Sequence, residues 1–303
     1  MTVGMDAGFT VAGTPTGRGV ATLPGPAGPG LPTVEQFGTG PAVVLVHGVG
    51  VGPDTFAALA DAVVAGGHRA VVVHRPGYGL ASAPAAVSLA DQVTTLAALV
   101  DALTSGADAS GAQGGVAGVI GVSGGATLAL LLALRLAADG EGVVPIVAHE
   151  PLLGPLAPAL HHRVRRAVSA LGAAGRPVRP VATTGFVRRL AGEATWARLP
   201  ASERDAVTER SALVAEEARA FAEVAPAATD LARLRPVTGV TTTVGAASGP
   251  ERRSAASVLA SLARVPVASV PGAGHLPQVD APAAFAAVAL AALGASPALG
   301  AAS

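Results

Sequence analysis

Apolar and polar positions in the first half of the chain follow a pattern typical of strands that alternate with helices. Short, nearly continuous apolar runs favour buried strands, and apolar residues spaced three or four apart favour helices that pack on them. Order is expected to begin near residues 34–38, and the predicted strands cover residues 42–46, 69–74, 116–122 and 142–148. The predicted helices cover residues 53–64, 88–103 and 126–135. This alternation predicts a doubly wound, mostly parallel sheet of the α/β class.

The alternation stops after residue 150. From 151 to 235 the pattern is helical and rich in arginine, and alternation then resumes with predicted strands at 237–244 and 265–270. Because ligands of open α/β sheets bind at the carboxyl ends of the strands, we expect the insertion to form a helical lid over that edge. The predicted organisation is an α/β core of residues 34–150 and 236–294, a helical lid of 151–235, and flexible tails of 1–33 and 295–303.

Composition and charge exclude several classes of function. The 20 basic and 20 acidic residues leave no net charge at pH 7, and the arginines are dispersed, so neither nucleic acid nor an acidic membrane surface is an expected partner. The chain has no cysteine, which rules out thiolate nucleophiles and disulfides. No secretory signal or membrane span is apparent, and we expect a soluble cytoplasmic protein. The sequence carries no signal for an oligomeric state.

The most informative stretch is Gly-Val-Ser-Gly-Gly at residues 121–125, which matches the pattern G-x-S-x-G. A predicted buried strand precedes it and a strong helix former follows it. A serine at such a strand-to-helix turn has its hydroxyl pushed clear of the backbone, and the flanking glycines allow the sharp turn. We therefore expect Ser123 to be a nucleophile.

A serine hydroxyl needs a base to take its proton, and histidine is the usual one. Among the seven histidines, His275 follows a predicted strand and a Pro-Gly-Ala-Gly loop, which brings it to the same sheet edge as Ser123. We expect it to be the base. The others are weaker candidates: His161 and His162 fall in the predicted lid, His68 falls in a turn, and His74 and His149 end strands, where they could line a pocket.

These features together resemble the α/β-hydrolase superfamily. The matching elements, in the family's order, are His-Gly at 47–48, Arg-Pro-Gly-Tyr-Gly at 75–79, the serine motif and Gly-His at 274–275, spread over residues 34–294. The resemblance implies that the backbone N–H groups of Val49 and Gly124 form the oxyanion hole. Two preorganised donors of this kind stabilise the tetrahedral intermediate of acyl transfer.

The acid of the expected triad departs from the family pattern. Ser248 stands where the family usually has an aspartate, and serine cannot stabilise an imidazolium by charge. Some family members carry the acid one strand earlier, which implies Glu150 here, at the end of a predicted strand. A glutamate in such apolar surroundings is costly to bury unless it is paired. We predict Glu150 as the acid, with Glu251 as the alternative.

Three further side chains are possible parts of a substrate pocket: His47, Tyr78 and Trp196. For His47 a structural role in its turn is favoured, and Trp196 fits the core of the lid better than a substrate platform. No cluster of histidines and carboxylates has metal-ligand spacing, and no complete nucleotide-binding motif is present, so neither a metal nor another cofactor is expected.

The leading hypothesis is a serine hydrolase that cleaves an ester, thioester, lactone or amide of a small-molecule substrate through an acyl-enzyme on Ser123. The first alternative is different chemistry at the same site: cofactor-free haloperoxidase or perhydrolase activity, or hydrolysis of a C–C bond. The second is a non-catalytic receptor for small molecules. The missing acid at Ser248 favours the receptor slightly, whereas an intact serine, histidine and alternative acid favour an enzyme.

Overall fold

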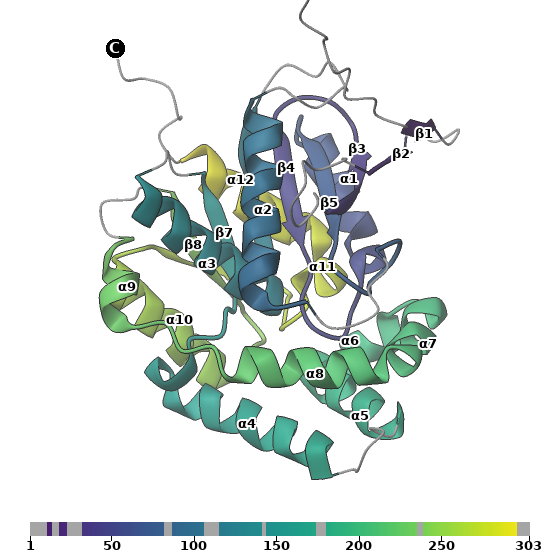
Figure 1. The fold of residues 1–303 in the computed structure, drawn as a ribbon, viewed down its shortest axis with the longest axis vertical. Helices are drawn as coiled ribbons and strands as arrows, with labels where there is room; N and C mark the ends of the chain where they lie inside the picture. Colours follow the sequence, from purple (N-terminus) through teal and green to yellow (C-terminus); the bar gives the residue numbers. More distant parts are fainter. Residues whose placement is uncertain are drawn as a thin grey trace, which may run out of the picture.

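One sheet runs through the whole molecule (Figure 1). The structure is a computed structural model that describes residues 11–13, 18–22, 32–81, 87–105, 115–140, 144–173, 180–234 and 239–295. In this part of the chain the sheet has nine strands in the order β1-β2-β3-β5-β4-β6-β7-β8-β9. Their bounds are Val11–Gly13 (β1), Arg18–Thr22 (β2), Thr33–Phe37 (β3), Ala42–Val46 (β4), Arg69–His74 (β5), Val116–Val122 (β6), Ile146–His149 (β7), Val240–Gly245 (β8) and Val267–Val270 (β9).

The six strands from β5 to β9 in sheet order are parallel, and β1, β2 and β3 join them in antiparallel pairs. The predicted α/β class with a doubly wound, mostly parallel sheet is confirmed. Parallel pairing also explains why the central strands read as nearly continuous apolar runs, because both faces of such a sheet are covered by helices.

Part of the segment of residues 1–33, which we predicted to be a loose tail, forms strands. Residues 11–13 and 18–22 form β1 and β2, and β2 pairs along β3 from Arg18 opposite Phe37 to Thr22 opposite Thr33. Strand pairing satisfies backbone hydrogen bonds and needs no apolar periodicity, so the composition of this segment gave no signal of it. The rest of the segment, and the predicted tail beyond residue 295, lie outside the described residues.

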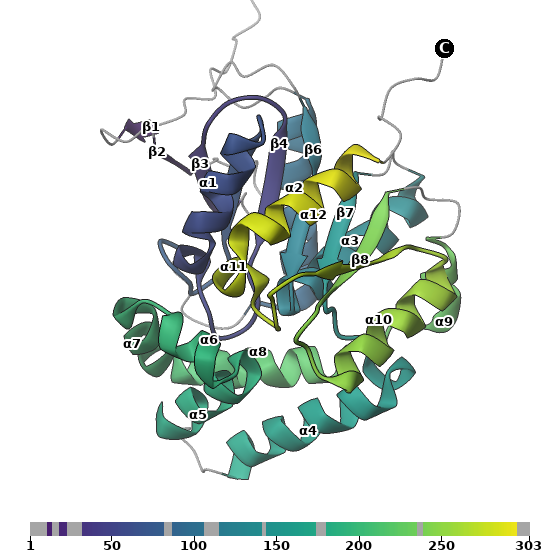
Figure 2. The ribbon, with the colours of Figure 1, turned by 180° about the vertical axis from the view of Figure 1, so that it is seen from behind.

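Helices cover both faces of the sheet. On one face, helices α2 (Leu89–Thr104), α3 (Gly124–Asp139) and α10 (Pro250–Ala263) share one hydrophobic core with Val44, Val46 and Val119. On the other, α1 (Ala57–Ala65) and α12 (Pro282–Gly294) pack on Val43, Leu45 and Ile120, as Figure 2 shows from behind. Neighbouring residues of β4 thus enter opposite cores, because successive side chains of a strand point to opposite faces. The short helices η1 (Pro53–Phe56) and α11 (Pro277–Asp280) precede α1 and α12.

Between β7 and β8 the described chain is helical. Figures 1 and 2 both show α4, α5 and α8 lying across one end of the sheet, where the chain leaves the carboxyl end of β7. No helix in the described part of the chain is long and apolar enough to cross a membrane. The bounds are Gly154–Leu156 (η2), Pro158–Ala173 (α4), Pro180–Ala191 (α5), Glu193–Arg198 (α6), Ala201–Glu209 (α7), Ser211–Ala222 (α8) and Ala228–Ala232 (α9).

Candidate active site

Ser123 occupies a strained turn between β6 and α3. Its φ of 55° lies in the left-handed region that side chains rarely adopt, and such strain is concentrated at functional sites. The neighbouring glycines are required by close backbone approach: a Cβ on Gly125 would lie 2.1 Å from the carbonyl oxygen of Val46, and one on Gly121 would lie 2.4 Å from the oxygen of Gly125. The turn therefore holds Ser123, which is partly exposed, at the carboxyl edge of the sheet.

His275 and Glu150 are hydrogen-bonded to each other at the same edge. His275 Nδ1 lies 2.7 Å from Glu150 Oε2, and both residues are buried, at 6% and 2% exposure. Glu150 directly follows β7 and has a φ of 52°, while His275 lies in the loop after β9. The backbone N–H of Ser123 donates to the carbonyl oxygen of His149, the residue before Glu150, at 2.9 Å. The sequence-predicted nucleophile, acid and base are thus carried by neighbouring strand ends.

The Ser123 hydroxyl has no hydrogen-bond partner among the residues that the structure describes. The structure therefore joins His275 to Glu150 but does not join Ser123 to His275. Catalytic hydrogen bonds often form only when substrate is present, so this geometry is compatible with a triad.

The Glu150 carboxylate receives donors on both oxygens. Oε2 faces His275 and also Arg252 Nη1 at 3.2 Å, while Oε1 accepts from the Gly245 N–H at 3.1 Å and from the Ser248 hydroxyl. Burial alone raises the pKa of Glu150, but the hydrogen bond from His275 and the neighbouring positive charges outweigh it and hold the pKa well below its usual range. A carboxylate so satisfied stays ionised despite its burial.

The structure separates the two candidate acids. Ser248, at the position where the family usually has an aspartate, donates to Glu150 instead of replacing it. Glu251 is partly exposed and pairs with Arg163 at 3.2 Å, and no hydrogen bond or ion pair within the described residues links it to His275. Of the two candidate acids, Glu150 is the one that is hydrogen-bonded to the imidazole in the described structure.

His275 is held as a neutral ring. Burial and the positive charge of Arg252 lower its pKa to about 4, against the opposing effect of Glu150. His149, weighed as a pocket residue, is instead fully buried: Nε2 lies 3.2 Å from the carbonyl oxygen of Gly274 and Nδ1 lies 3.0 Å from the Thr243 hydroxyl. Its ring therefore supports the loop that carries His275.

The two residues predicted for the oxyanion hole lie against each other. A Cβ on Gly124 would lie 3.1 Å from Val49 Cγ2, and one on Gly48 would lie 3.0 Å from the Cβ of Ser123. Gly124 is the first residue of α3, where backbone N–H groups have no intrahelical acceptor. The loop of residues 47–52 thus packs directly on the serine turn.

His47 and Tyr78 support this loop rather than line a pocket. His47 Nδ1 lies 2.9 Å from the Gly48 carbonyl oxygen, and Nε2 accepts the Arg75 N–H at 3.3 Å. Burial and the charge of Arg75 lower the pKa of His47 well below its ordinary value. The fully buried Tyr78 accepts the Gly50 N–H at 3.0 Å. Both side chains thus bond to loop 47–52 or its neighbour Arg75, and neither lines the cavity beside His275.

Trp196 is partly buried and packs against the hydrophobic core that includes α1 and α12. It does not line the described cavity beside His275. The same core also includes Phe186 and Val187 of α5, which belong to the helical insertion.

The sequence does not predict the buried ion pair between Arg75 and Glu217, which lies next to loop 47–52. Glu217 of α8 accepts from the Arg75 guanidinium and, at 2.5 Å, from the Tyr78 hydroxyl, while Arg75 Nη1 donates to the Gly48 carbonyl at 2.9 Å. The Glu217 and Arg75 side chains are 3% and 2% exposed. Arg75 lies in a segment that the sequence did single out. Glu217 and Arg252 each stand next to another residue of the same charge, Glu216 and Arg253, so no local signal distinguishes them.

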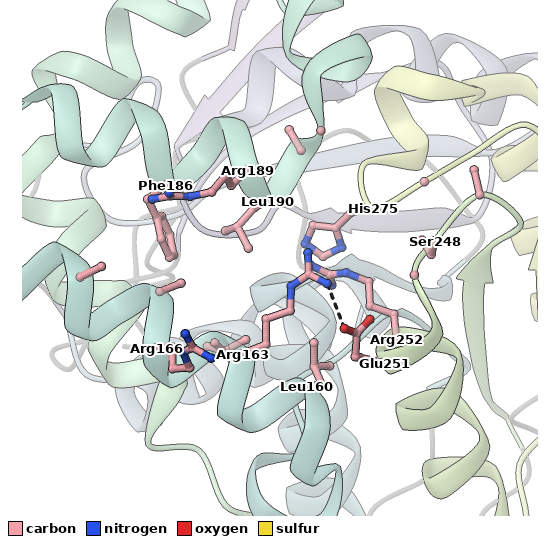
Figure 3. A pocket seen from close by; sticks show the side chains of 18 residues that line it. Leu160, Arg163, Arg166, Phe186, Arg189, Leu190, Ser248, Glu251, Arg252 and His275 are labelled. Carbon is pink, nitrogen blue, oxygen red and sulfur yellow. Dashed lines mark hydrogen bonds and ion pairs between the residues drawn. The ribbon is translucent and has the colours of Figure 1, made fainter.

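A cavity of about 490 Å³ opens beside His275 (Figure 3). Helices α4, α5 and α10 and the loops that carry Ser248 and His275 line it. Apolar side chains such as Leu160, Phe186 and Leu190 form part of the wall. A cavity of this size accommodates a small organic molecule.

Comparison with known proteins identifies the family. The chain belongs to the alpha/beta hydrolase family, whose sequence model matches residues 43–288. Among curated proteins, none matches the sequence significantly.

Solved structures share the fold at low sequence identity. A thermophilic esterase from Thermogutta terrifontis is 21% identical over 92% of this chain and 94% of its own, with a TM-score of 0.64. A hydrolase from Pseudomonas aeruginosa PA01 is 20% identical over 95% and 98%, with a TM-score of 0.61. A thioesterase domain from the curacin biosynthetic pathway is 15% identical over 93% and 99%, with a TM-score of 0.58. At these identities the likeness shows the fold alone.

Proposed function

We propose that the protein is a serine hydrolase that cleaves a carboxylic ester or a related acyl bond through an acyl-enzyme on Ser123. The observation that carries the proposal is the buried hydrogen bond of 2.7 Å between His275 Nδ1 and Glu150 Oε2, at the sheet edge where Ser123 sits in a strained turn. Thioesters, lactones and amides are the other acyl bonds that the same groups attack.

In the proposed mechanism, His275 takes the proton of the Ser123 hydroxyl as its oxygen attacks the acyl carbonyl carbon. Glu150 holds the Nδ1 side of the imidazole and stabilises the imidazolium. The N–H groups of Val49 and Gly124 stabilise the oxyanion, and His275 returns its proton to the leaving group. Water, activated by the same imidazole, then attacks the acyl-enzyme, which releases the acid and restores Ser123.

Several features support this assignment. The Glu150 carboxylate is held ionised, as the stabilising acid of a triad must be, and His275 is neutral at physiological pH, as a base must be. The similar folds include an esterase and a thioesterase, whose names both denote acyl transfer to water. In the same proposal, the insertion of residues 151–235 acts as a lid and shapes the specificity of the site.

Labelling with a fluorophosphonate tests the nucleophile directly. We expect one covalent adduct, located at Ser123 by mass spectrometry and absent from the Ser123→Ala variant. A panel of p-nitrophenyl esters of increasing acyl length then measures turnover. A folded protein that neither reacts with the probe nor hydrolyses any ester contradicts the proposal, and saturable binding of those esters without turnover would favour a receptor.

A further inference from the structure

The cavity beside His275 is unusually basic for a protein with no net charge. Four arginines line it, against one acidic side chain, that of Glu251. They come from three helices: Arg163 and Arg166 from α4, Arg189 from α5 and Arg252 from α10. Figure 3 shows these side chains around the same hollow as the His275 ring.

Two of the four charges are compensated and two are not. Arg252 pairs with Glu150, and Arg163 pairs with Glu251. Arg166 and Arg189 are exposed and have no ion pair or hydrogen bond within the described part of the chain. An anion in the cavity would therefore meet guanidinium groups that are free to bind it, and guanidinium binds carboxylate and phosphate oxygens through paired N–H donors.

The position of the cavity indicates which half of the substrate it holds. His275, Gly274 and Ser248 are among its lining residues, whereas Ser123 and the predicted oxyanion residues Val49 and Gly124 are not. In acyl transfer the histidine gives its proton to the leaving group, so the leaving group lies on the histidine side of the reacting carbon. The cavity therefore lies on the histidine side of the site, where the leaving group departs.

We propose that the substrate of this hydrolase carries an anionic group, a carboxylate or a phosphate, on its alcohol or thiol half, and that Arg166 and Arg189 bind it. The inference rests on the proposed hydrolase function and specifies its substrate class. The apolar wall of Leu160, Phe186 and Leu190 contacts the carbon skeleton between the scissile bond and the anion. The reaction adds water across the acyl bond and releases a carboxylic acid and the anionic alcohol or thiol.

Two chromogenic esters with the same acyl group test the charge preference. They are 4-nitrophenyl butyrate, with a neutral leaving group, and 3-carboxy-4-nitrophenyl butyrate, with an anionic one. Each kcat/KM is divided by the rate constant of the same ester with hydroxide, which corrects for intrinsic reactivity. We expect the corrected ratio to favour the anionic ester by about ten-fold at low salt and to shrink as salt screens the charges.

Single arginine variants on α4 and α5 test the two proposed anion-binding residues. Arg166→Gln and Arg189→Gln are each expected to lower that ratio by about three-fold, the range for a partly exposed charge pair. Arg165→Gln is the control, because Arg165 is on α4 but does not line this cavity. Inhibition of neutral-ester hydrolysis by inorganic phosphate and by acetate, at constant ionic strength, then distinguishes the two anions.

A second pair of esters, which differ by a charge on the acyl half, tests which half of the substrate the cavity binds. If 4-nitrophenyl hydrogen suberate, and not 3-carboxy-4-nitrophenyl butyrate, gains over its neutral counterpart, the assignment to the leaving-group half is wrong. A ratio that the Arg166 and Arg189 variants leave unchanged, or that Arg165→Gln lowers equally, overturns the proposed site.

A failure of the proposed hydrolase function can be distinguished from a failure of the proposed anion site. It would appear as absent fluorophosphonate labelling and no turnover of any ester. Calorimetric titration of Ser123→Ala with 3-carboxy-4-nitrophenol measures anion binding without catalysis. If this phenol binds and Arg166→Gln weakens its binding, the anion site is supported even in the absence of hydrolysis. If the phenol does not bind, the proposed anion site is wrong.

Discussion

Glu150 is the side chain on which the candidate site depends most. It contacts His275, Arg252, Ser248 and the Gly245 N–H, so one carboxylate ties together the ends of β7 and β8 and the loop after β9. The serine at the usual acid position has become a donor to the carboxylate of the next strand. In this arrangement Glu150 holds the imidazole of His275 although residue 248 is a serine.

Substitution of that carboxylate should affect catalysis far more than substitution of the alternative acid. We expect Glu150→Gln to lower kcat by about 10³–10⁴-fold, because an amide neither fixes the histidine tautomer nor stabilises its charge. Glu251→Gln should keep kcat within about three-fold, since its ion pair is partly exposed. Steady-state kinetics with a neutral ester measures both, and circular dichroism checks that each variant is folded. The opposite order of effects would show that Glu251 is the acid.

The pH dependence of kcat/KM should be sensitive to the charge of Arg252. A base must be unprotonated, so kcat/KM rises with pH through the pKa of His275 and levels off above it, with the acid limb near pH 4. Arg252 is one cause of that low pKa, so Arg252→Gln should raise the pKa and move the acid limb towards the ordinary value near 6.5. Profiles of kcat/KM measure the shift. Arg135→Gln, an exposed change on α3, is the control, and a limb that stays in place or moves to lower pH contradicts the assignment.

At the scale of elements, helix α8 of the insertion is connected to the loop after β4 through buried polar contacts. Glu217 holds Arg75 and Tyr78, which in turn hold the carbonyl of Gly48 and the N–H of Gly50. A second contact comes from α7, where Glu203 accepts the Gly52 N–H at 2.7 Å. The insertion therefore contributes to the shape of the loop that carries Val49.

Removal of the Glu217 charge should destabilise the protein and the site together. Breaking a buried ion pair leaves the partner charge uncompensated and costs about 3–5 kcal/mol, so Glu217→Gln should lower the free energy of unfolding by about that amount. We also expect kcat to fall with little change in KM, because the loop carrying Val49 loosens. Urea denaturation and steady-state kinetics measure the two effects.

The matched control is Glu223→Gln at the end of the same helix. Its ion pair with Arg165 is exposed on both sides, so a change of about 1 kcal/mol or less is expected. Equal losses in the two variants would contradict the structural role assigned to the buried pair.

At the scale of the whole molecule, three of the buried histidines make the fold sensitive to acid. Burial lowers the pKa values of His47, His149 and His275 below the ordinary value of 6.5. As pH falls below about 6.5 the unfolded chain therefore binds protons before the folded one does, and stability decreases with falling pH. Each histidine contributes up to about 1.4 kcal/mol per pH unit in that window.

Chemical denaturation from pH 8 to pH 5 should show an unfolding free energy that is nearly constant above pH 7 and falls below about pH 6.5. His149→Gln should make the fall less steep, since one of the three sites is gone. A double variant at His161 and His162, which lie on helix α4 and are not buried, should leave the slope as it is. A stability that rises on acidification would contradict the burial of these rings as neutral groups.

The sequence by itself determined the class of fold and which residues are candidates for the site. Apolar runs mark parallel strands because both of their faces are buried, and the glycines around Ser123 mark a turn that only glycines allow. These signals are local, so a single chain segment carries each of them. The edge strands of residues 11–13 and 18–22 escaped prediction, because backbone pairing leaves no such pattern.

Only the tertiary structure decided which carboxylate meets His275 and what surrounds it. Glu150 and His275 are 125 positions apart, and Arg252 and Glu217 lie on helices where many charged residues look alike. Their contacts depend on how strands β7 to β9 and the inserted helices pack, and on burial that strengthens every charge interaction between them. Pairing across such distances is a property of the packed chain, which is why the basic cavity beside His275 emerges only in the folded molecule.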